Sequence, residues 1–508
     1  MSTTSTNEKM TNYRWVICGL LFFATTVNYL DRQVLSLTWK DFIAPEFHWT
    51  NTDYGNITSF FSICYAIFML FAGKFVDWMD TRKGYLWAIG IWSVGAILHA
   101  FCGIGAAGYI ADKWTLSFEG ARNAIKAVDN AGLIASSSVG LFMFARAVLA
   151  LGESGNFPAA IKSTAEYFPK KDRAFSTSIF NSGATVGALI APVTIPTIAA
   201  RFGWEMSFLI IGALGFIWMG FWIFLYKKPH DNHKVNKAEL DYILQDKAAE
   251  SVKNNDIEKE GKSMPYLQCF KYKQTWAFAV GKFMTDGVWW FYLFWAPAYL
   301  SEVYGYTSNS LMSKTLIFVL YAITMLSIIG GWLPTYFVDK KGMNPYDGRM
   351  RAMLIFAFFP LLALMAQPLG HISPWFPIII IGIAAAAHQA WSANIFSTVG
   401  DMFPKAAIAT VTGIGGMAGG VGSYIILKGS GKLFDYASGT TMIGNNTVVM
   451  TKELLAQGSQ YVSGPLRFMG FEGIRAGYFI VFCFCAVAYI IGWLIMKSLV
   501  PKFKLIED

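Results

Sequence analysis

Six charged side chains stand inside long apolar runs of this sequence. A charge is costly in apolar surroundings, so such residues are kept when they pair with one another, bind a ligand or carry a proton. Arginine holds a carboxylate through two parallel hydrogen bonds, and a buried carboxyl group can take up and release a proton. These residue types therefore predict a site for an anion and a proton. They are Asp31, Arg32, Arg146, Glu153, Lys282 and Asp286.

The spacing of these charges decides which of them can act together. Arg146 and Glu153 are seven residues apart, so they share one helix face at a separation of about 10 Å. Lys282 and Asp286 are four residues apart and can pair directly. One alternative is that such pairs merely neutralise each other and hold helices together. If all six groups face one cavity, an entering anion favours protonation of one carboxylate, which is the basis of anion/proton symport.

Uncharged polar and aromatic side chains extend the candidate site along the same runs. In the segment 388–394, hydrogen-bonding groups fall within about two helical turns. A ligand with many hydroxyl groups needs such partners. The alternatives are a histidine packed in the core and Trp or Tyr anchors at a membrane surface. The set comprises His388, Gln389, Trp391, Ser392 and Asn394 in this segment, and Tyr29, Tyr65, Asn181, Trp289, Trp290 and Tyr292 elsewhere.

The composition is that of a membrane protein. Of the 508 residues, 55% are hydrophobic and 14% are charged, against about 25% charged in soluble domains. The net charge of +9 comes from Lys and Arg spread over short loops, which argues against nucleic acid as a partner. The six cysteines have no metal-ligand spacing, and the sequence has no catalytic motif. We therefore expect neither an enzyme nor a bound metal or cofactor.

Apolar runs of the length of a membrane span recur along the chain, six on each side of a polar stretch. They predict an all-α membrane protein with 12 transmembrane helices in two six-helix halves. The first half comprises residues 1–226, a cytoplasmic central loop residues 227–273, and the second half residues 274–508. The expected spans are 13–37, 54–77, 84–106, 132–155, 173–199, 204–226, 274–300, 312–338, 351–370, 375–398, 404–428 and 472–498.

The two halves carry matching motifs at corresponding places. The fourth span is followed by EYFPK at 166–170, and the tenth by DMFPK at 401–405. Asp77 at the end of the second span matches Asp339, followed by Lys340, at the end of the eighth. Internal repeats of this kind are typical of transporter folds. Two segments without a counterpart are expected as outer insertions, at 107–131 and 431–471.

Positive charges in short loops favour the cytoplasmic side of a membrane. With the start of the chain inside, cytoplasmic loops carry Arg82, Lys170 and Lys340, whereas short outer loops offer little beyond Lys40 and Arg201. Both termini are therefore expected in the cytoplasm. The first apolar run is expected to remain as a span, because no small-residue cleavage site comes after it.

A motif between the second and third spans, GKFVD at 73–77 leading into TRK at 81–83, resembles the loop signature of the major facilitator superfamily. Twelve spans in two related halves resemble the fold of that family. Trp78 stands where the family commonly has a basic residue, and Asp80 where it commonly has glycine. The resemblance implies a gate formed by this loop and its counterpart in the second half. The gate residues would be Asp77, Arg82, Asp339 and Lys340.

Four further segments resemble a narrower group, the anion:cation symporter family. NYLDR at 28–32 and RAVLALGESGNFP at 146–158 are similar to that family as a whole. GKFMTDGVWWFYLFW at 281–295 and AHQAWSAN at 387–394 are similar to its bacterial hexuronate transporters. The resemblance implies proton-coupled import of galacturonate or glucuronate by alternating access. The setting would be the lipid bilayer of a bacterial cytoplasmic membrane, with a monomer as the functional unit.

The resemblance also implies roles for single residues. Lys282 stands where galactonate-type relatives carry a neutral amide, so it either contacts the uronate or is neutralised by Asp286. Another organic anion, such as an aldonate, an aromatic acid or a sulfonated sugar, is an alternative cargo, and a sugar-acid sensor that does not transport is another alternative. The implied roles are proton coupling for Asp31 and Glu153, contact with the anion and gating for Arg32 and Arg146, and ligand binding for Tyr29, Tyr65 and Lys282. The residues themselves add His388, Gln389, Trp391 and Asn394 to the binding site, with Asp286, Asn181 and Tyr292 as secondary candidates.

Overall fold

The computed structural model describes residues 9–253, 264–444 and 446–506, and most of these residues lie in helices. Ten helical segments in this part of the chain are long and apolar enough to cross a membrane. Two more long helices, α1 (Arg14–Thr38) and α12 (Lys273–Tyr304), carry the neighbouring charges 31/32 and 282/286. Together they complete the expected set of twelve. The chain is a multi-pass, all-α membrane protein.

The first half begins with α1 and contains three interruptions between its longer helices. Its other long helices are α3 (Asn51–Met79), α4 (Thr81–Ala111), α6 (Ala131–Glu153) continued by α7 (Asn156–Tyr167), α8 (Lys170–Phe202) and α9 (Trp204–Leu225). The interruptions are the π-helix η1 (Trp39–Ile43) and the short helices α2 (Ala44–Phe47) and α5 (Phe118–Lys126).

The second half comes after the central elements η2 (Pro229–Asp231), α10 (Lys237–Lys253) and α11 (Tyr266–Cys269). Two of its spans are broken by 3₁₀ turns. They are α13 (Leu311–Thr324), η3 (Met325–Ile328) and α14 (Ile329–Lys341), and then α15 (Pro345–Phe358), η4 (Phe359–Met365) and α16 (Ala366–Gly370). The remaining elements are α12, α17 (Trp375–Met402), α18 (Lys405–Ser438), β1 (Thr440–Ile443), β2 (Asn446–Val449), α19 (Lys452–Ala456), β3 (Arg467–Phe468), β4 (Phe471–Glu472) and α20 (Ile474–Leu499).

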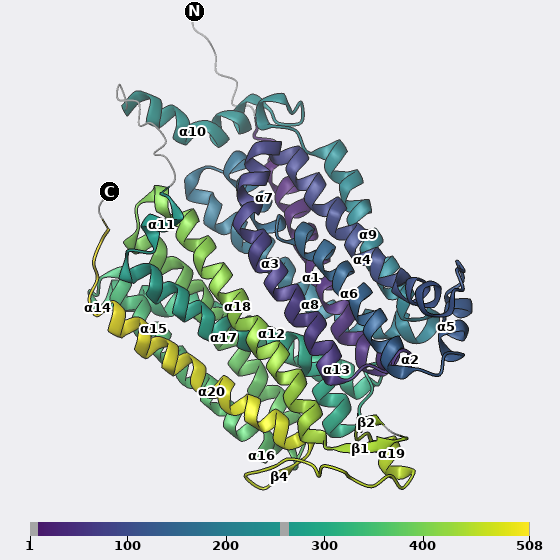
Figure 1. The fold of residues 1–508 in the computed structure, drawn as a ribbon. Coiled ribbons are helices and arrows are strands. Elements are labelled where there is room, and N and C mark those ends of the chain that lie inside the picture. Colours follow the sequence, from purple (N-terminus) through teal and green to yellow (C-terminus); the bar gives the residue numbers. More distant parts are fainter. Residues whose placement is uncertain (1–8, 254–263, 445, 507–508) are drawn as a thin grey trace, which may run out of the picture.

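The two halves lie side by side, the first in purple to teal and the second in green to yellow (Figure 1). Across their boundary α3 packs against α18, and α8 packs against α13. The start of α1, the end of α20, α10 and α11 lie at one end of the bundle, which we call the α10 end. The opposite end carries α2, α5 and the strands, and we call it the η1 end.

The matching motifs occupy the same backbone positions in both halves. Phe168 and Phe403 each end a helix in an extended conformation, and a proline precedes the next helix. Glu166 accepts a hydrogen bond from the Thr81 hydroxyl at 2.6 Å. The equivalent carboxylate, on Asp401, instead pairs with an arginine of α15 at 2.7 Å. The structure thus confirms the repeat of the backbone, and among the described side chains the carboxylate has a neutral partner in one half and a cation in the other.

The turns after α3 and α14 also correspond. Gly342 has φ 63° and Asp80 has φ 68°, a left-handed region that glycine adopts without strain. With ψ 151°, Asp80 has a conformation that an L side chain rarely adopts. Its carboxylate accepts a hydrogen bond from the backbone N–H of Thr81 at 2.9 Å. The residue that replaces the family's usual glycine therefore stands where glycine would relieve strain.

Helix α10 of the central loop is attached to the first half through Glu239. Its buried carboxylate accepts hydrogen bonds from the backbone N–H groups of Tyr13 at 2.8 Å and Arg14 at 3.0 Å, and it pairs with the Arg14 guanidinium at 3.2 Å. Tyr13, at the N-cap of α1, offers no side-chain acceptor to its own helix. Glu239 therefore satisfies N–H groups that a helix start leaves unpaired.

The two insertions differ in structure. Helix α5 of the first carries Arg122, which bridges Glu46 on α2 at 3.1 Å and Glu205 on α9 at 2.7 Å. Burial raises the pKa of Glu46.

In the second insertion, residues 431–438 continue α18, because Gly431 packs against the backbone of Asn51 in α3. Beyond α18, this insertion forms two antiparallel hairpins, β1–β2 and β3–β4.

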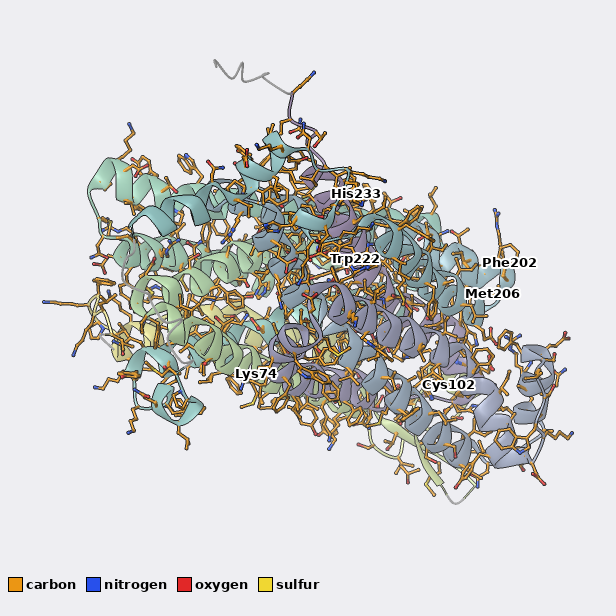
Figure 2. The ribbon with its side chains drawn as sticks, turned by 90° about the horizontal axis from the view of Figure 1, so that it is seen from above. Lys74, Cys102, Phe202, Met206, Trp222 and His233 are labelled. Carbon is orange, nitrogen blue, oxygen red and sulfur yellow. The ribbon has the colours of Figure 1, made fainter. Side chains whose placement is uncertain are left out.

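Large aromatic side chains fill the interior of the first half. Trp222 is fully buried and stacks between Trp218 and Tyr226, with ring centres 4.8 and 4.0 Å away. Phe202, in contrast, lies at the outer edge of the bundle and is 64% exposed (Figure 2). Exposed apolar groups of this kind suit a surface that faces lipid.

Candidate functional site

The charged residues of the first half converge on one buried cluster between α1, α4 and α6. Gly152 permits the close packing that this requires, because a Cβ at its position would lie 2.2 Å from the backbone nitrogen of Trp92 on α4. Helix α6 ends at the next residue, Glu153. Its carboxylate reaches Arg32 of α1, with Oε2 accepting from Nε at 3.0 Å and from Nη2 at 2.7 Å.

Four aromatic rings, one of them that of Phe61 at 5.9 Å, surround the Arg32 guanidinium. Its central carbon lies 5.1 Å from the ring centres of Tyr29 and Tyr65 and 5.3 Å from that of Trp290. Such distances suit cation–π attraction. Tyr29 and Tyr65 belong to the first half, whereas Trp290 comes from α12 of the second. The cluster therefore borders the boundary between the halves.

Arg146 differs from Arg32 in its partners. Its side chain is 1% exposed, yet none of its three guanidinium nitrogens has a hydrogen-bond acceptor among the described residues. The ring of Phe61 lies 5.2 Å away. A buried donor without an acceptor is costly, and a buried cation more so. Arg146 therefore keeps its hydrogen-bond donors unused within the described part of the chain.

Asp31 is the acidic counterpart of Arg146. It is 2% exposed, and neither carboxylate oxygen has a hydrogen-bond partner among the described residues. The charges of Glu153 and Arg146 act on it, and the indole of Trp92 is nearby. The cluster therefore combines one closed ion pair with one carboxylate and one guanidinium that lack hydrogen bonds. Two acids and two bases make it formally neutral.

Sequence reasoning missed the aromatic residues that cover the cluster toward the η1 end. The rings of Trp39 and Tyr54 stack at 4.0 Å, and Trp295 meets Tyr54 edge-on at 5.0 Å. The Tyr54 hydroxyl donates a hydrogen bond to the backbone carbonyl of Phe294 across the half boundary, at 2.8 Å. Aromatic residues inside an apolar run look like ordinary core residues, so no sequence signal distinguishes this group.

In the second half, Lys282 and Asp286 form the direct ion pair that their spacing predicts, at 2.7 Å. Lys282 Nζ also lies 4.2 Å from the ring centre of Phe396. Helix α18 comes close to the pair, because a Cβ at Gly419 would lie 2.2 Å from Asp286 Oδ2. The second-half charges thus already satisfy each other.

The segment 388–394 on α17 divides into different roles. His388 Nδ1 lies 2.7 Å from the Tyr489 hydroxyl, and its ring stacks on that of Trp289 at 5.6 Å. Trp391 is buried, and its indole N–H has no acceptor among the described residues. The Asn394 amide donates to two backbone carbonyls, one on α14 and one on α17, both at 2.8 Å. Asn394 therefore fastens two helices together.

The remaining candidates lie in varied surroundings. Tyr292 on α12 is buried, and its hydroxyl lacks a partner in the described part of the chain. Gln389 is half-buried, and Asn181 on α8 is exposed. None of these positions tests a role in binding.

The expected gate residues lie at the α10 end. Arg82 donates a hydrogen bond to the backbone carbonyl of Ile223 at 2.7 Å. Asp339 and Lys340 are exposed at the end of α14. The side chain of Asp77 lies outside the described residues. The gate stays a prediction.

At the η1 end, polar contacts join the two halves. Lys40 of η1 pairs with Glu302 of α12. Asp41 accepts hydrogen bonds from the backbone N–H and the hydroxyl of Ser308, both at 2.6 Å. Asp435 of α18 accepts from the first two backbone N–H groups of α3, at 3.0 and 2.7 Å. We call this set of contacts the η1 lock.

Comparisons with known proteins agree with this architecture. The family model described as Major Facilitator Superfamily matches residues 21–426. The chain therefore belongs to the major facilitator superfamily. It is a secondary transporter of that type and, like its relatives, not an enzyme.

Two curated relatives and two solved structures are similar to the chain. The Hexuronate transporter of Escherichia coli K12 is 27% identical over 432 residues, covering 84% of this chain and 89% of the relative. The Galacturonate transporter of Dickeya chrysanthemi is 26% identical over 336 residues, covering 66% and 86%. A bacterial homologue of the lysosomal transporter Spinster aligns with a TM-score of 0.65 at 17% identity, covering 96% and 98%. A D-xylose-proton symporter aligns with a TM-score of 0.63 at 14% identity, covering 97% and 100%.

Proposed function

We propose that the protein imports a hexuronate, galacturonate or glucuronate, together with protons across a bacterial inner membrane. The observation that carries this proposal is the buried guanidinium of Arg146, which lacks a hydrogen-bond acceptor among the described residues. The nearby carboxylate of Asp31 is also buried and also lacks a hydrogen-bond partner among them. The names of the two curated relatives support a sugar acid as cargo. Both termini would then face the cytoplasm.

The substrate carboxylate would bind to Arg146. Its fork geometry suits two parallel hydrogen bonds to a carboxylate. The bound carboxylate would neutralise the positive charge of Arg146, which otherwise favours the ionised form of Asp31. The carboxylate of Asp31 would then gain a proton more readily. The anion and the proton would therefore favour each other's binding by the same factor, which promotes their movement together.

The sugar ring would lie at the boundary between the halves. Tyr29 and Tyr65 of the first half and Trp290 of the second surround Arg32 there. Aromatic faces and hydroxyl groups suit the alternating apolar and polar surface of a sugar. Glu153 would take part in coupling as well, because protonation of its carboxylate would weaken its ion pair with Arg32.

Movement of the halves would follow alternating access. The η1 lock and the Tyr54 contact with α12 close the η1 end, and this supports a state that opens toward the α10 end. Import requires the lock to break and re-form in each cycle. The rigid halves would rock about the contacts of α3 with α18 and of α8 with α13.

Uptake of labelled galacturonate and glucuronate into proteoliposomes tests the proposal. We expect accumulation above equilibrium with an inward proton gradient, and loss of accumulation when the gradient is collapsed. A panel of unlabelled aldonates, aromatic acids and sulfonated sugars should compete weakly. Sealed vesicles that take up neither hexuronate but do take up another anion of the panel would overturn the substrate assignment while keeping the transporter class. Binding of a hexuronate without any uptake would instead indicate a sensor.

A further inference from the structure

A groove on the second half opens between α12, α18 and α20 and has a volume of about 280 Å³. Its walls are apolar and include Ile425, which is 55% exposed, and Phe484, which is 44% exposed. The three helices pack against one another and run side by side (Figure 1). α18 and α20 are long and apolar enough to cross a membrane. The groove therefore opens toward the bilayer.

The length of the groove matches one leaflet. On α18 its lining residues run from Gly422 to Leu433, which is about 16 Å at 1.5 Å per residue. The hydrocarbon core of a bilayer is about 30 Å thick, so one leaflet contributes about 15 Å. A single acyl chain lying along α18 would fill this length.

Glycines make the groove deep enough for a chain. A Cβ at Gly422 would lie 2.1 Å from the backbone carbonyl oxygen of Phe283, so α12 and α18 touch at the floor. Nothing lies within 4 Å of a Cβ built at Gly429, which opens into the groove. A larger residue at Gly429 would therefore occupy the groove without disturbing the protein.

Two polar groups stand at the η1 end of the groove. Ser430 lines it and is 2% exposed, and its hydroxyl has no partner among the described residues. Lys432 is exposed, and it lies three residues beyond Gly429 on the same side of the helix. A buried hydroxyl can donate to an ester carbonyl, and a lysine near a membrane surface can extend to a phosphate.

We propose that this groove binds one phospholipid of the surrounding bilayer. One acyl chain lies between α12, α18 and α20, its ester carbonyl accepts a hydrogen bond from Ser430, and its phosphate pairs with Lys432. An anionic headgroup is preferred because Lys432 places a cation at this end of an apolar groove. The proposal is independent of the transported substrate.

The position of the groove connects the lipid to the moving boundary. Gly420 and Gly431 of α18 touch α3, where added Cβ atoms would lie 2.2 Å from Ala66 Cβ and 2.4 Å from the backbone oxygen of Asn51. At 100° per residue these two positions share one face, and Gly429 stands on nearly the opposite face. The lipid would thus pack on the side of α18 opposite to its contact with the first half.

Native mass spectrometry of the purified full-length protein tests the proposal, with dioleoylphosphatidylglycerol and dioleoylphosphatidylcholine as probes. Gly429→Leu should raise the apparent Kd for both lipids at least fivefold by filling the groove. Gly220→Leu is the matched control, because a Cβ at this position on α9 also has nothing within 4 Å. It should leave both Kd values within twofold of the unmodified protein.

Lys432→Gln tests the headgroup contact. It should remove at least a threefold preference for the anionic lipid and lower the affinity for phosphatidylcholine less, because choline already neutralises the phosphate of that lipid. Thermal unfolding in detergent should show Gly429→Leu at least as stable as the unmodified protein, because leucine favours a helix more than glycine does. The proposal is overturned if the Kd values of Gly429→Leu for both lipids equal those of Gly220→Leu. It is also overturned if phosphatidylglycerol and phosphatidylcholine have equal Kd values in the unmodified protein and in Lys432→Gln.

Discussion

The two halves of the transporter share a fold but treat their buried charges in opposite ways. In the second half, Lys282 and Asp286 form an ion pair on one helix, so each charge has its partner one turn away. In the first half, the carboxylate of Asp31 and the guanidinium of Arg146 lack hydrogen-bond partners within the described structure. A ligand or a proton gains the most binding free energy where it supplies a hydrogen bond that a buried donor or acceptor lacks. We therefore place the proposed coupling of anion and proton in the first half, and the second half would only line the binding site.

Removing the positive charge of Arg146 should produce the largest loss of hexuronate uptake. We expect Arg146→Gln to lower kcat/KM for hexuronate uptake at least 100-fold, because a buried charge-assisted contact is worth about 3 kcal/mol. Arg146→Lys keeps the charge without the planar fork and should lose about tenfold. Initial uptake rates into proteoliposomes measure both. A loss below tenfold for Arg146→Gln would make this residue structural and remove the contrast between the halves.

Neutralising the paired acid of the first half should separate transport from its driving force. We expect Glu153→Gln to abolish accumulation driven by a proton gradient while leaving counterflow exchange at half the normal rate or more, because exchange needs no net proton movement. Gradient-driven uptake and counterflow in the same vesicles provide the comparison. Unchanged accumulation would exclude Glu153 from coupling.

A double-mutant cycle at the second-half pair tests whether that pair is self-contained. Asp286→Asn leaves Lys282 as a buried, unpaired cation, and we expect about a tenfold loss of uptake. Combining it with Lys282→Gln should recover activity to within threefold of the unmodified protein, a recovery of at least about 0.7 kcal/mol over the single variant. If the double variant stays as impaired as the single one, Lys282 contacts the substrate and both halves bind it.

Reversing the charges of the η1 lock tests how the halves hold together. Lys40→Glu and Glu302→Lys should each reduce turnover about fivefold, because like charges then meet where the halves close. The double reversal should return turnover to within twofold. KM for the hexuronate should change little in all three variants, and a large KM change would place the lock within the binding site.

The smallest effect concerns the paired turns at Asp80 and Gly342. We expect Asp80→Gly to raise the free energy of unfolding by about 1 kcal/mol, because relief of backbone strain exceeds the few tenths lost with the cap. Asp80→Ala loses the cap and keeps the strain, so it should be destabilising. Thermal unfolding in detergent measures both. A lower stability for Asp80→Gly would show that the cap, not the strain, dominates this turn.

Much of this architecture is predictable from sequence because a bilayer imposes simple rules. Apolar length gives the spans, and the repeated Phe-Pro motif gives the two halves, as the matched backbone at Phe168 and Phe403 confirms. The spacing of Lys282 and Asp286 likewise predicts their ion pair. Such features depend on local periodicity alone.

Contacts between distant segments are not predictable in this way. The partner of Glu153 is Arg32 on α1 rather than Arg146 on its own helix, and only the tertiary arrangement of α1 and α6 brings these two residues together. The sequence places Asn394 among the ligand-binding candidates but does not indicate that its amide NH2 group donates to backbone carbonyls of two helices. The π-helix at η1, which carries Lys40 to the second half, has a wider turn that no sequence pattern reveals.

The cap that Glu239 provides for α1 has a consequence for biosynthesis. Arg14 and Glu239 are separated by 225 residues, so α1 leaves the ribosome and enters the membrane well before its cap has been translated. Until then its first backbone N–H groups must be met by water or lipid headgroups. Docking of α10 therefore comes after synthesis of all six helices of the first half, and it marks the point at which that half is complete.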